Sequence, residues 1–171
     1  RMNKTFVEKL AKLVASFRKK AEEFKKDIKM GRTQLQDAVP MTSGQEFNAF
    51  ANLLEAEIAN LNKSAEMFLE INMGGTAIGT GLNAAPGFPE VCARKLSEFT
   101  GMPFRASEDL VAATPDTTDL VNYSGAMKRL AIKLSKICND LRLMASGPRC
   151  GLNEINLPPM APGSSIMPGK V

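Results

Sequence analysis

The amino-acid sequence contains three long stretches in which apolar residues recur every three or four positions. In the first stretch, from Lys4 to Lys29, these positions are Phe6, Leu10, Leu13, Val14, Phe17, Phe24 and Ile28. This spacing places them on one face of an amphipathic α-helix. We expect Gly31 to end this helix and residues 32–40 to form a polar connection.

The second stretch starts with residues that can cap a helix. Thr42 and Ser43 can both act as N-caps, and Glu46 follows Ser43 by three positions, as in a capping box. The apolar positions beyond them are Phe47, Phe50, Leu54, Ile58, Leu61, Phe68 and Ile71. We therefore expect a helix that extends as far as Met73, far beyond the average of about 11–12 residues.

A glycine-rich loop and a shorter helix follow. Residues 74–87 include Gly74, Gly75, Gly79, Gly81 and Gly87, a composition typical of a loop. Pro89 suits the first turn of a helix that runs to Thr100 and stops at Gly101. Residues 102–115 have no clear period and are expected to be irregular.

The third long stretch carries two apolar seams. Asp116 or Thr117 can cap its helix, which should reach about Ala145. The first seam is Leu120, Ser124, Met127, Ala131, Leu134, Cys138 and Leu141, and the second is Leu130, Ile137 and Met144. A helix with two seams needs more neighbours than three long helices supply, so we expect it to lie in an intersubunit bundle. A large bundle within one chain is the alternative.

Helical periodicity ends near Ser146. Residues 146–171 are rich in proline and glycine, and a segment of this length without regular structure is either functional or disordered. We expect two parts, a central bundle domain of long helices at 1–145, with loops at 30–42 and 74–87, and a loop segment at 146–171. The expected fold class is all-α.

The composition is that of a soluble globular protein, with 44% hydrophobic and 23% charged residues. The net charge of +4 weakly favours anionic partners. Its densest basic run, within residues 18–29, is interleaved with acidic residues and is typical of a solvated helix face. Aromatic residues are few, and no apolar run can span a bilayer, so we expect neither a nucleic-acid nor a membrane partner.

Cysteine and histidine usage restrict the chemistry further. Cys92, Cys138 and Cys150 are widely spaced and odd in number, as expected for reduced thiols in a cytoplasmic protein. The chain has no histidine. Ser-His-Asp and Cys-His catalysis within this chain are thereby excluded, and the commonest metal ligand is missing. We expect no metal site and no cofactor, and any catalytic base must be an unusual one.

The last nine residues, Gly-Ser-Ser-Ile-Met-Pro-Gly-Lys-Val at 163–171, combine two hydroxyls, one ammonium and two glycines. Such a loop can offer backbone N–H groups, hydroxyls and a cation to an anion. It does not fit a phosphate-binding loop, because the glycine spacing is wrong and Val171 replaces the metal-binding Ser or Thr. An ordinary solvated turn is the alternative.

This stretch resembles the signature of the fumarase/aspartase superfamily. Residues 31–40, 75–83 and 135–158 resemble further segments of the same superfamily, so the resemblance covers nearly the whole chain. Residues 136–142 and 151–158 are most similar to its aspartate ammonia-lyase branch. The resemblance implies a homotetramer built around a central bundle of long helices. It also implies reversible deamination of L-aspartate to fumarate and ammonia, by anti elimination through an aci-carboxylate intermediate.

The resemblance also implies roles for individual residues. Ser164 would be the catalytic base, and Ser165 and Lys170 would hold the substrate carboxylate with backbone N–H groups. Met167 would lie over the loop, either as a substrate contact or as a packing residue. Thr33 and Gln34 would reach the substrate from a different subunit, with satisfaction of a turn as the structural alternative.

Gln34 helps to separate branches of the superfamily. Many relatives, including the fumarases, carry histidine at this position. Glutamine forms hydrogen bonds but cannot shuttle a proton. Its presence favours a deaminating enzyme, because an amine can leave as ammonium without that acid.

The remaining family segments would lie outside these residues. The substrate-grasping Thr and Ser-Thr-Asn segments would precede residue 1, and a closing Asn and a C-terminal domain would follow Val171. We therefore expect a fragment of an aspartate ammonia-lyase that is inactive alone. The alternatives are a fumarate hydratase and a non-catalytic helical assembly fragment.

Overall fold

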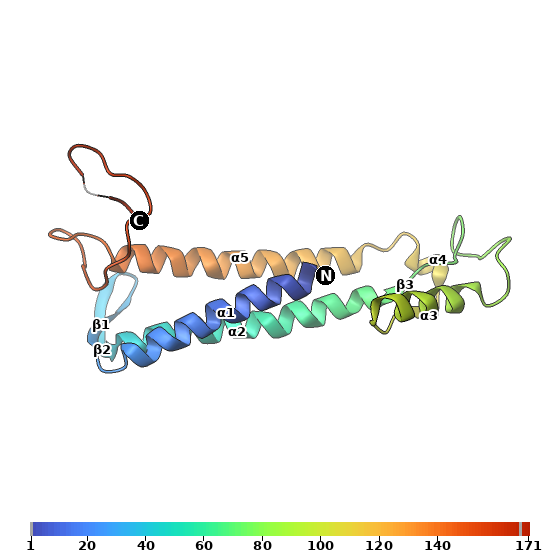
Figure 1. The fold of residues 1–171 in the computed structure, drawn as a ribbon, viewed down its shortest axis with the longest axis horizontal. Coiled ribbons are helices and arrows are strands. Elements are labelled where there is room, and N and C mark those ends of the chain that lie inside the picture. The colour runs from blue at the N-terminus through green and yellow to red at the C-terminus, as the bar shows by residue number, and fades with distance from the viewer. Residues whose placement is uncertain (1, 168) are drawn as a thin grey trace. The chain divides into compact units, whose positions relative to one another are not determined.

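The computed structural model describes residues 2–167 and 169–171, and most of them are helical. The long helices are α1 (Met2–Glu23), α2 (Ser43–Glu66) and α5 (Thr118–Met144), and α3 (Phe88–Thr100) is shorter. Figure 1 shows a small hairpin between α1 and α2, irregular segments before and after α3, and a non-helical tail after α5. The described strands are few and short, so the predicted all-α fold is confirmed.

The chain divides into two compact units. One comprises Lys9–Glu55 and Arg129–Val171, and the other comprises Arg1–Glu8 and Ala56–Lys128. Each of the three long helices contributes residues to both units. The predicted domain boundary at residue 145 separates the helices from the tail and does not coincide with these two units. It stays a prediction.

The core of the first unit is an aromatic cluster between α1 and α2. Phe47 of α2 has ring-centroid distances of 6.1 Å to Phe17, 5.3 Å to Phe24 and 5.9 Å to Phe50. The contacts of Phe47 with Phe24 and Phe50, and the contact of Phe17 with Phe50, are edge-on, a geometry that aromatic rings prefer. Buried aliphatic residues of the same unit include Leu10, Val14, Leu54, Leu130, Ile137 and Met144.

A hairpin lies where helix and a polar connection were expected. Helix α1 ends at Glu23, and strands β1 (Ile28–Thr33) and β2 (Gln36–Thr42) pair antiparallel. The prediction of a helix up to Lys29 was therefore wrong. The cause is a contact distant in sequence, because the N–H groups of Ser43 and Gly44 donate to the carbonyl groups of Asp27 and Phe24 at 2.8 and 3.0 Å. These bonds turn the chain at a point where the local apolar spacing still suits a helix.

Helix α2 begins with a capping box one residue earlier than its predicted version. The Thr42 hydroxyl accepts a hydrogen bond from Gln45 N–H at 3.1 Å, and Gln45 Oε1 accepts one from Thr42 N–H at 2.9 Å. Thr42 is therefore confirmed as a cap, whereas pairing of Ser43 with Glu46 was wrong. The Glu46 side chain instead contacts Lys29.

The second unit contains the glycine-rich loop and the short helices. Helix α2 ends at Glu66, short of the predicted Met73, and continues as the 3₁₀ turn η1 (Met67–Leu69) and strand β3 (Glu70–Ile71). Strand β3 pairs parallel with β4 (Arg105–Ala106), and α4 (Leu110–Ala113) follows. Pairing with β4 is another distant contact, which ends the helical run early. The loop at 74–87 and helix α3, with Gly101 as C-cap, are confirmed.

Only one of the two predicted seams of α5 is covered within the described chain. Leu130, Ile137 and Met144, the second seam, are all buried. Of the first seam, Leu120 is 62% exposed, and Ser124, Ala131 and Cys138 are exposed as well. The role of the first seam in an intersubunit bundle stays a prediction.

The chain after Met144 folds back onto the end of α5. The Asn153 N–H donates to Ser146 O at 2.8 Å, and the Glu154 N–H donates to Met144 O at 2.9 Å. These bonds satisfy carbonyl groups that a helix end leaves without partners. No helix occurs among the described residues of 146–171, as predicted. No helix in the described part of the chain is long and apolar enough to cross a membrane.

Candidate functional site

The signature residues form a closed loop. Ala161 and Lys170 pair as an antiparallel bridge, in which Lys170 N–H donates to Ala161 O at 3.0 Å and Ala161 N–H donates to Lys170 O at 2.9 Å. Gly169 fits beside Pro159 because it lacks a side chain, since an added Cβ would lie 2.7 Å from Pro159 Cβ. The base of the loop is therefore fixed by backbone contacts.

Ser164, Ser165 and Met167 lie within this loop, between the two paired residues. The Met167 N–H donates to Ser164 O at 3.2 Å, which makes a tight turn across the serine pair. The side chains of all three residues and of Lys170 are exposed. The loop therefore gathers the four residues that the signature singles out and presents them to solvent. Pro168 lies outside the described residues.

Thr33 and Gln34 lie at the turn of the β1–β2 hairpin. Thr33 pairs with Gln36, and the two residues between them, Gln34 and Leu35, have φ values of 50° and 64°. Positive φ at both central residues is the mark of a type I′ hairpin turn, which normally uses Asn or Gly. A left-handed backbone at a non-glycine residue costs about 1–3 kcal/mol and often marks a functional site. The strain favours a role for this turn beyond joining two strands.

In the described part of the chain, the hairpin turn and the signature loop line different surfaces. Gln34 lines a cavity of 280 Å³ whose other walls come from the hairpin, α2, α5 and Leu152. In Figure 1 the signature loop extends away from the end of α5, whereas the hairpin lies against it. The two sets of predicted site residues therefore lie apart within the unit that contains both.

A cluster of buried charges connects the hairpin to the tail. The Glu154 carboxylate lies 2.7 Å from Arg32 Nη1 through one oxygen and 3.0 Å from Lys29 Nζ through the other. Lys29 also contacts the Glu46 carboxylate, and its ammonium lies 3.1 Å from Met144 Sδ. The side chains of Lys29, Glu154 and Arg32 are only 7%, 16% and 21% exposed.

The charges of this cluster compensate one another. Burial acts to raise the pKa of Glu154, but its contacts with Lys29 and Arg32 outweigh burial and hold that pKa below its ordinary value. Glu154 Oε2 is buried and faces Lys29 as an ion pair, without well-aligned hydrogen-bond geometry. The carboxylate is thus ionised at neutral pH and forms ion pairs with both Lys29 and Arg32.

Local sequence patterns do not reveal this cluster. Its four charged residues lie on β1, on α2 and in the tail, and no local pattern connects Lys29 with Glu154. A β-bulge between Met30 and Arg32 contributes as well, because bulges increase strand twist. Lys29 and Arg32 would point to opposite faces of a regular strand, yet both reach Glu154.

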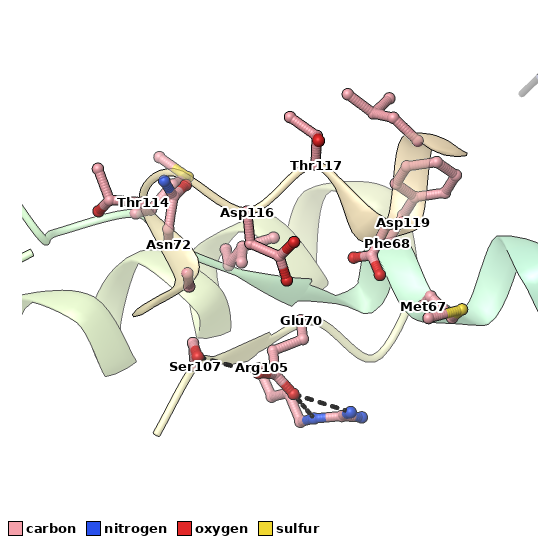
Figure 2. A pocket seen from close by; sticks show the side chains of 14 residues that line it. Met67, Phe68, Glu70, Asn72, Arg105, Ser107, Thr114, Asp116, Thr117 and Asp119 are labelled. Carbon is pink, nitrogen blue, oxygen red and sulfur yellow. Dashed lines mark hydrogen bonds and ion pairs between the residues drawn. The ribbon is translucent and has the colours of Figure 1, made fainter. Parts of the chain in front are cut away.

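A cavity of 540 Å³ in the other unit contains none of the predicted site residues. Figure 2 shows its Glu70 held by Arg105 and Ser107. The hydrogen bonds from Ser107, at 2.9 Å, and from Arg105, at 3.1 Å, hold the pKa of Glu70 below its ordinary value. Asp116 and Asp119 also line this cavity. Three carboxylates against one guanidinium make it a poor site for a dicarboxylate anion.

Comparisons with known proteins place the chain in a narrow group. A family model described as "Lyase" matches residues 1–171. The "Aspartate ammonia-lyase" of Escherichia coli strain K12 is 57% identical over 165 residues, which are 96% of this chain and 34% of that protein. The chain thus spans about a third of the length of the curated relatives that it matches.

Solved structures of lyases and fumarases are also similar to this chain. The fumarate lyase:delta crystallin from Brucella melitensis, in a crystal structure bound to cobalt, matches with a TM-score of 0.94 at 52% identity. That match covers 99% of this chain and 37% of the Brucella chain. A class II fumarase from Schistosoma mansoni matches with a TM-score of 0.86 at 37% identity, over 96% of this chain and 38% of its own.

Proposed function

The chain belongs to the lyase family, as its resemblance to the fumarase/aspartase superfamily predicted, and we propose that it is the central part of an aspartate ammonia-lyase. The observation that carries this proposal is the 57% identity to the Escherichia coli enzyme over 96% of the chain. The closed signature loop and the strained hairpin turn support it. The parent protein converts L-aspartate into fumarate and ammonia, and the reaction is reversible.

The difficult step is removal of a proton from the carbon beside the distal carboxylate. That C–H bond is weakly acidic, and its electron pair must move into the carboxylate to form an aci-carboxylate. Donors placed in advance around this group lower the barrier, and one such donor is worth about 3–4 kcal/mol. Collapse of the intermediate then expels the amine, which leaves as ammonia, and fumarate remains. The scheme draws on side chains and backbone groups alone, without a metal or cofactor.

Ser164 takes the proton in this scheme. A serine alkoxide becomes a usable base only where water is excluded and nearby donors support the anion. In the described chain the Ser164 side chain is exposed, so the enclosing surfaces have to come from the rest of the parent assembly. Closure of the loop over the substrate would supply that environment. Ser165, Lys170 and Met167 line the substrate in the same closed state.

Thr33 and Gln34 contact the substrate bound at another subunit. Their separation from the signature loop within one unit supports this arrangement, because a single chain does not assemble both halves. The exposed first seam of α5, with Leu120 62% exposed, supports a homotetramer with a shared helical bundle. A cytoplasmic location belongs to the same proposal, and the free thiols of Cys92, Cys138 and Cys150 support it.

The direct test is turnover by the full-length parent. Fumarate formation from L-aspartate, followed by ultraviolet absorbance, is the expected result. Fumarate formation from L-malate instead would identify a fumarate hydratase. Absence of fumarate formation from either substrate would favour a non-catalytic helical assembly protein. Gln34 argues against the hydratase, because an amide cannot transfer the proton that a departing hydroxide needs.

A further inference from the structure

Glu154 has contacts that an ordinary surface carboxylate lacks. Its backbone is fixed to the end of α5, where Glu154 N–H donates to Met144 O at 2.9 Å. Next to it, Gly151 approaches Ser146 so closely that an added Cβ would lie 2.3 Å from Ser146 C. The carboxylate is therefore presented from a rigid support rather than from a mobile chain.

The two cations that Glu154 binds belong to the strand that leads into the hairpin turn. Arg32, whose Nη1 lies 2.7 Å from the carboxylate, comes one residue before Thr33. Lys29 Nζ, at 3.0 Å, lies at the start of the same strand. A carboxylate that bridges two points of one strand fixes its rotation as well as its position. Charge-assisted contacts of this kind are stronger than neutral hydrogen bonds.

The hairpin turn needs such support. Gln34 and Leu35 both have left-handed backbone conformations, and their side chains are exposed. Strained conformations persist only where the surroundings over-determine them. The described contacts of β2 with β1 close the hairpin, while the ion pairs of Glu154 attach it to α5 and the tail.

We propose that Glu154 is a positioning residue for the ammonia-lyase reaction, which by bridging Lys29 and Arg32 holds Thr33 and Gln34 in the geometry that contacts substrate. This inference rests on the proposed function for the roles of Thr33 and Gln34. Glu154 itself touches no reacting atom. It couples the hairpin to the segment that continues into the signature loop, so that both candidate site segments share one anchor.

The test uses Glu154→Gln in the full-length parent, with Asp37→Asn as the matched control. Both substitutions replace a carboxylate by its amide beside Arg32. Asp37, however, is 75% exposed and lies 3.7 Å from Arg32 Nε, so it contributes little to positioning. Hydrogen–deuterium exchange of the amides of residues 29–36 reports on the hairpin without any substrate. We expect exchange there to be faster in Glu154→Gln and unchanged in Asp37→Asn.

Kinetics with L-aspartate distinguish positioning from general damage. A lesion that inactivates part of the enzyme lowers the apparent kcat and leaves KM unchanged, whereas misplaced binding groups raise KM. We expect KM of Glu154→Gln to rise at least about 10-fold, which corresponds to a loss of about 1.4 kcal/mol in substrate binding. In a Thr33→Ala background, the same substitution should cost less, because the part of its effect that acts through Thr33 is already lost.

The outcomes separate the two proposals. Unchanged hairpin exchange in Glu154→Gln, or an unchanged KM despite faster exchange, would overturn the positioning role even in an active enzyme. Equal costs in the wild-type and Thr33→Ala backgrounds would overturn it too. Absence of turnover by the wild-type parent would instead reject the proposed function, whatever the exchange data show.

Discussion

Replacement of Glu154 by glutamine also has a defined consequence for stability. The substitution keeps the shape of the side chain and removes its charge, which leaves Lys29, 7% exposed, with Glu46 as its acidic partner in the cluster. Hydrogen bonds to charged groups contribute about 1.5–3 kcal/mol, and breaking a buried ion pair costs about 3–5 kcal/mol. Glutamine still presents one side-chain oxygen to Lys29 and Arg32. We therefore expect a loss of about 2–3 kcal/mol at pH 7, in the upper part of the first range and below the second.

The pH dependence follows from the direction of the Glu154 pKa shift. Its contacts hold the pKa in the folded protein below the ordinary value, so the ionised form is favoured by folding. Its stabilisation is complete above the pKa of the unfolded chain, about 4.3 for a glutamate. It is lost as the pH falls through the lower folded pKa. The difference between wild type and Glu154→Gln should therefore be constant from pH 7 to about 5 and shrink below about 4.

Urea unfolding of the parent protein, followed by circular dichroism at pH values from neutral to acidic, measures this difference. Asp37→Asn serves as the control, with an expected change within about 0.5 kcal/mol at every pH, because exposed ion pairs contribute little. A Glu154→Gln difference that stays constant down to about pH 3 would refute the reasoning. So would a difference no larger than that of the control.

Three further predictions concern the hairpin and its supports. Leu35→Gly should slow hydrogen exchange in the hairpin, because glycine relieves a backbone strain of about 1–3 kcal/mol and its own entropic cost is only about 0.5–1 kcal/mol; faster exchange would contradict the strain. Gly44→Ala should destabilise the protein by at least about 1–3 kcal/mol, since the added Cβ would lie 2.5 Å from Ala21 O, and an unchanged thermal midpoint would contradict this close approach. Thr42→Ala should cost about 1 kcal/mol through loss of the capping box with Gln45, a value that urea unfolding can measure and that a neutral result would exclude.

Local patterns in the sequence predicted the helices well where one face of the helix decides the structure. Phe47, Phe50, Leu54 and Leu61 of the α2 stripe and the second seam of α5 follow the 3.6-residue period, and all of them are buried as expected. Gly101 and Pro89 mark the ends of α3 because their backbone preferences act locally. These signals depend on neighbours within a few residues.

The hairpin could not be predicted in the same way. Phe24 and Ile28 continue the helical spacing, and the turn residues Gln34 and Leu35 are not those that type I′ turns prefer. What turns the chain after α1 is the hydrogen bonding of the Phe24 and Asp27 carbonyl groups, just beyond the helix, by the N–H groups of Gly44 and Ser43 at the start of α2. Such a contact between segments about twenty residues apart produces no periodic pattern of apolar residues in the sequence.

In the candidate site, too, sequence patterns predicted neighbouring residues but not contacts between distant segments. The signature residues around Ser164 were found because they are contiguous and resemble a known motif. Glu154 precedes that motif by nine residues, but its partners Lys29 and Arg32 are more than a hundred residues earlier, so its role became visible only in the structure. Contacts of this range are set by the fold rather than by spacing along the chain.

The central claim is that Ser164, carried by the closed signature loop, removes the proton from the substrate. The most direct measurement compares fumarate formation from L-aspartate by the full-length parent and by its Ser164→Ala variant. Removal of a general base predicts a fall in kcat of about 100- to 10,000-fold, with the oligomeric state and the circular dichroism spectrum unchanged. A correctly folded Ser164→Ala enzyme that keeps its full kcat would contradict the account.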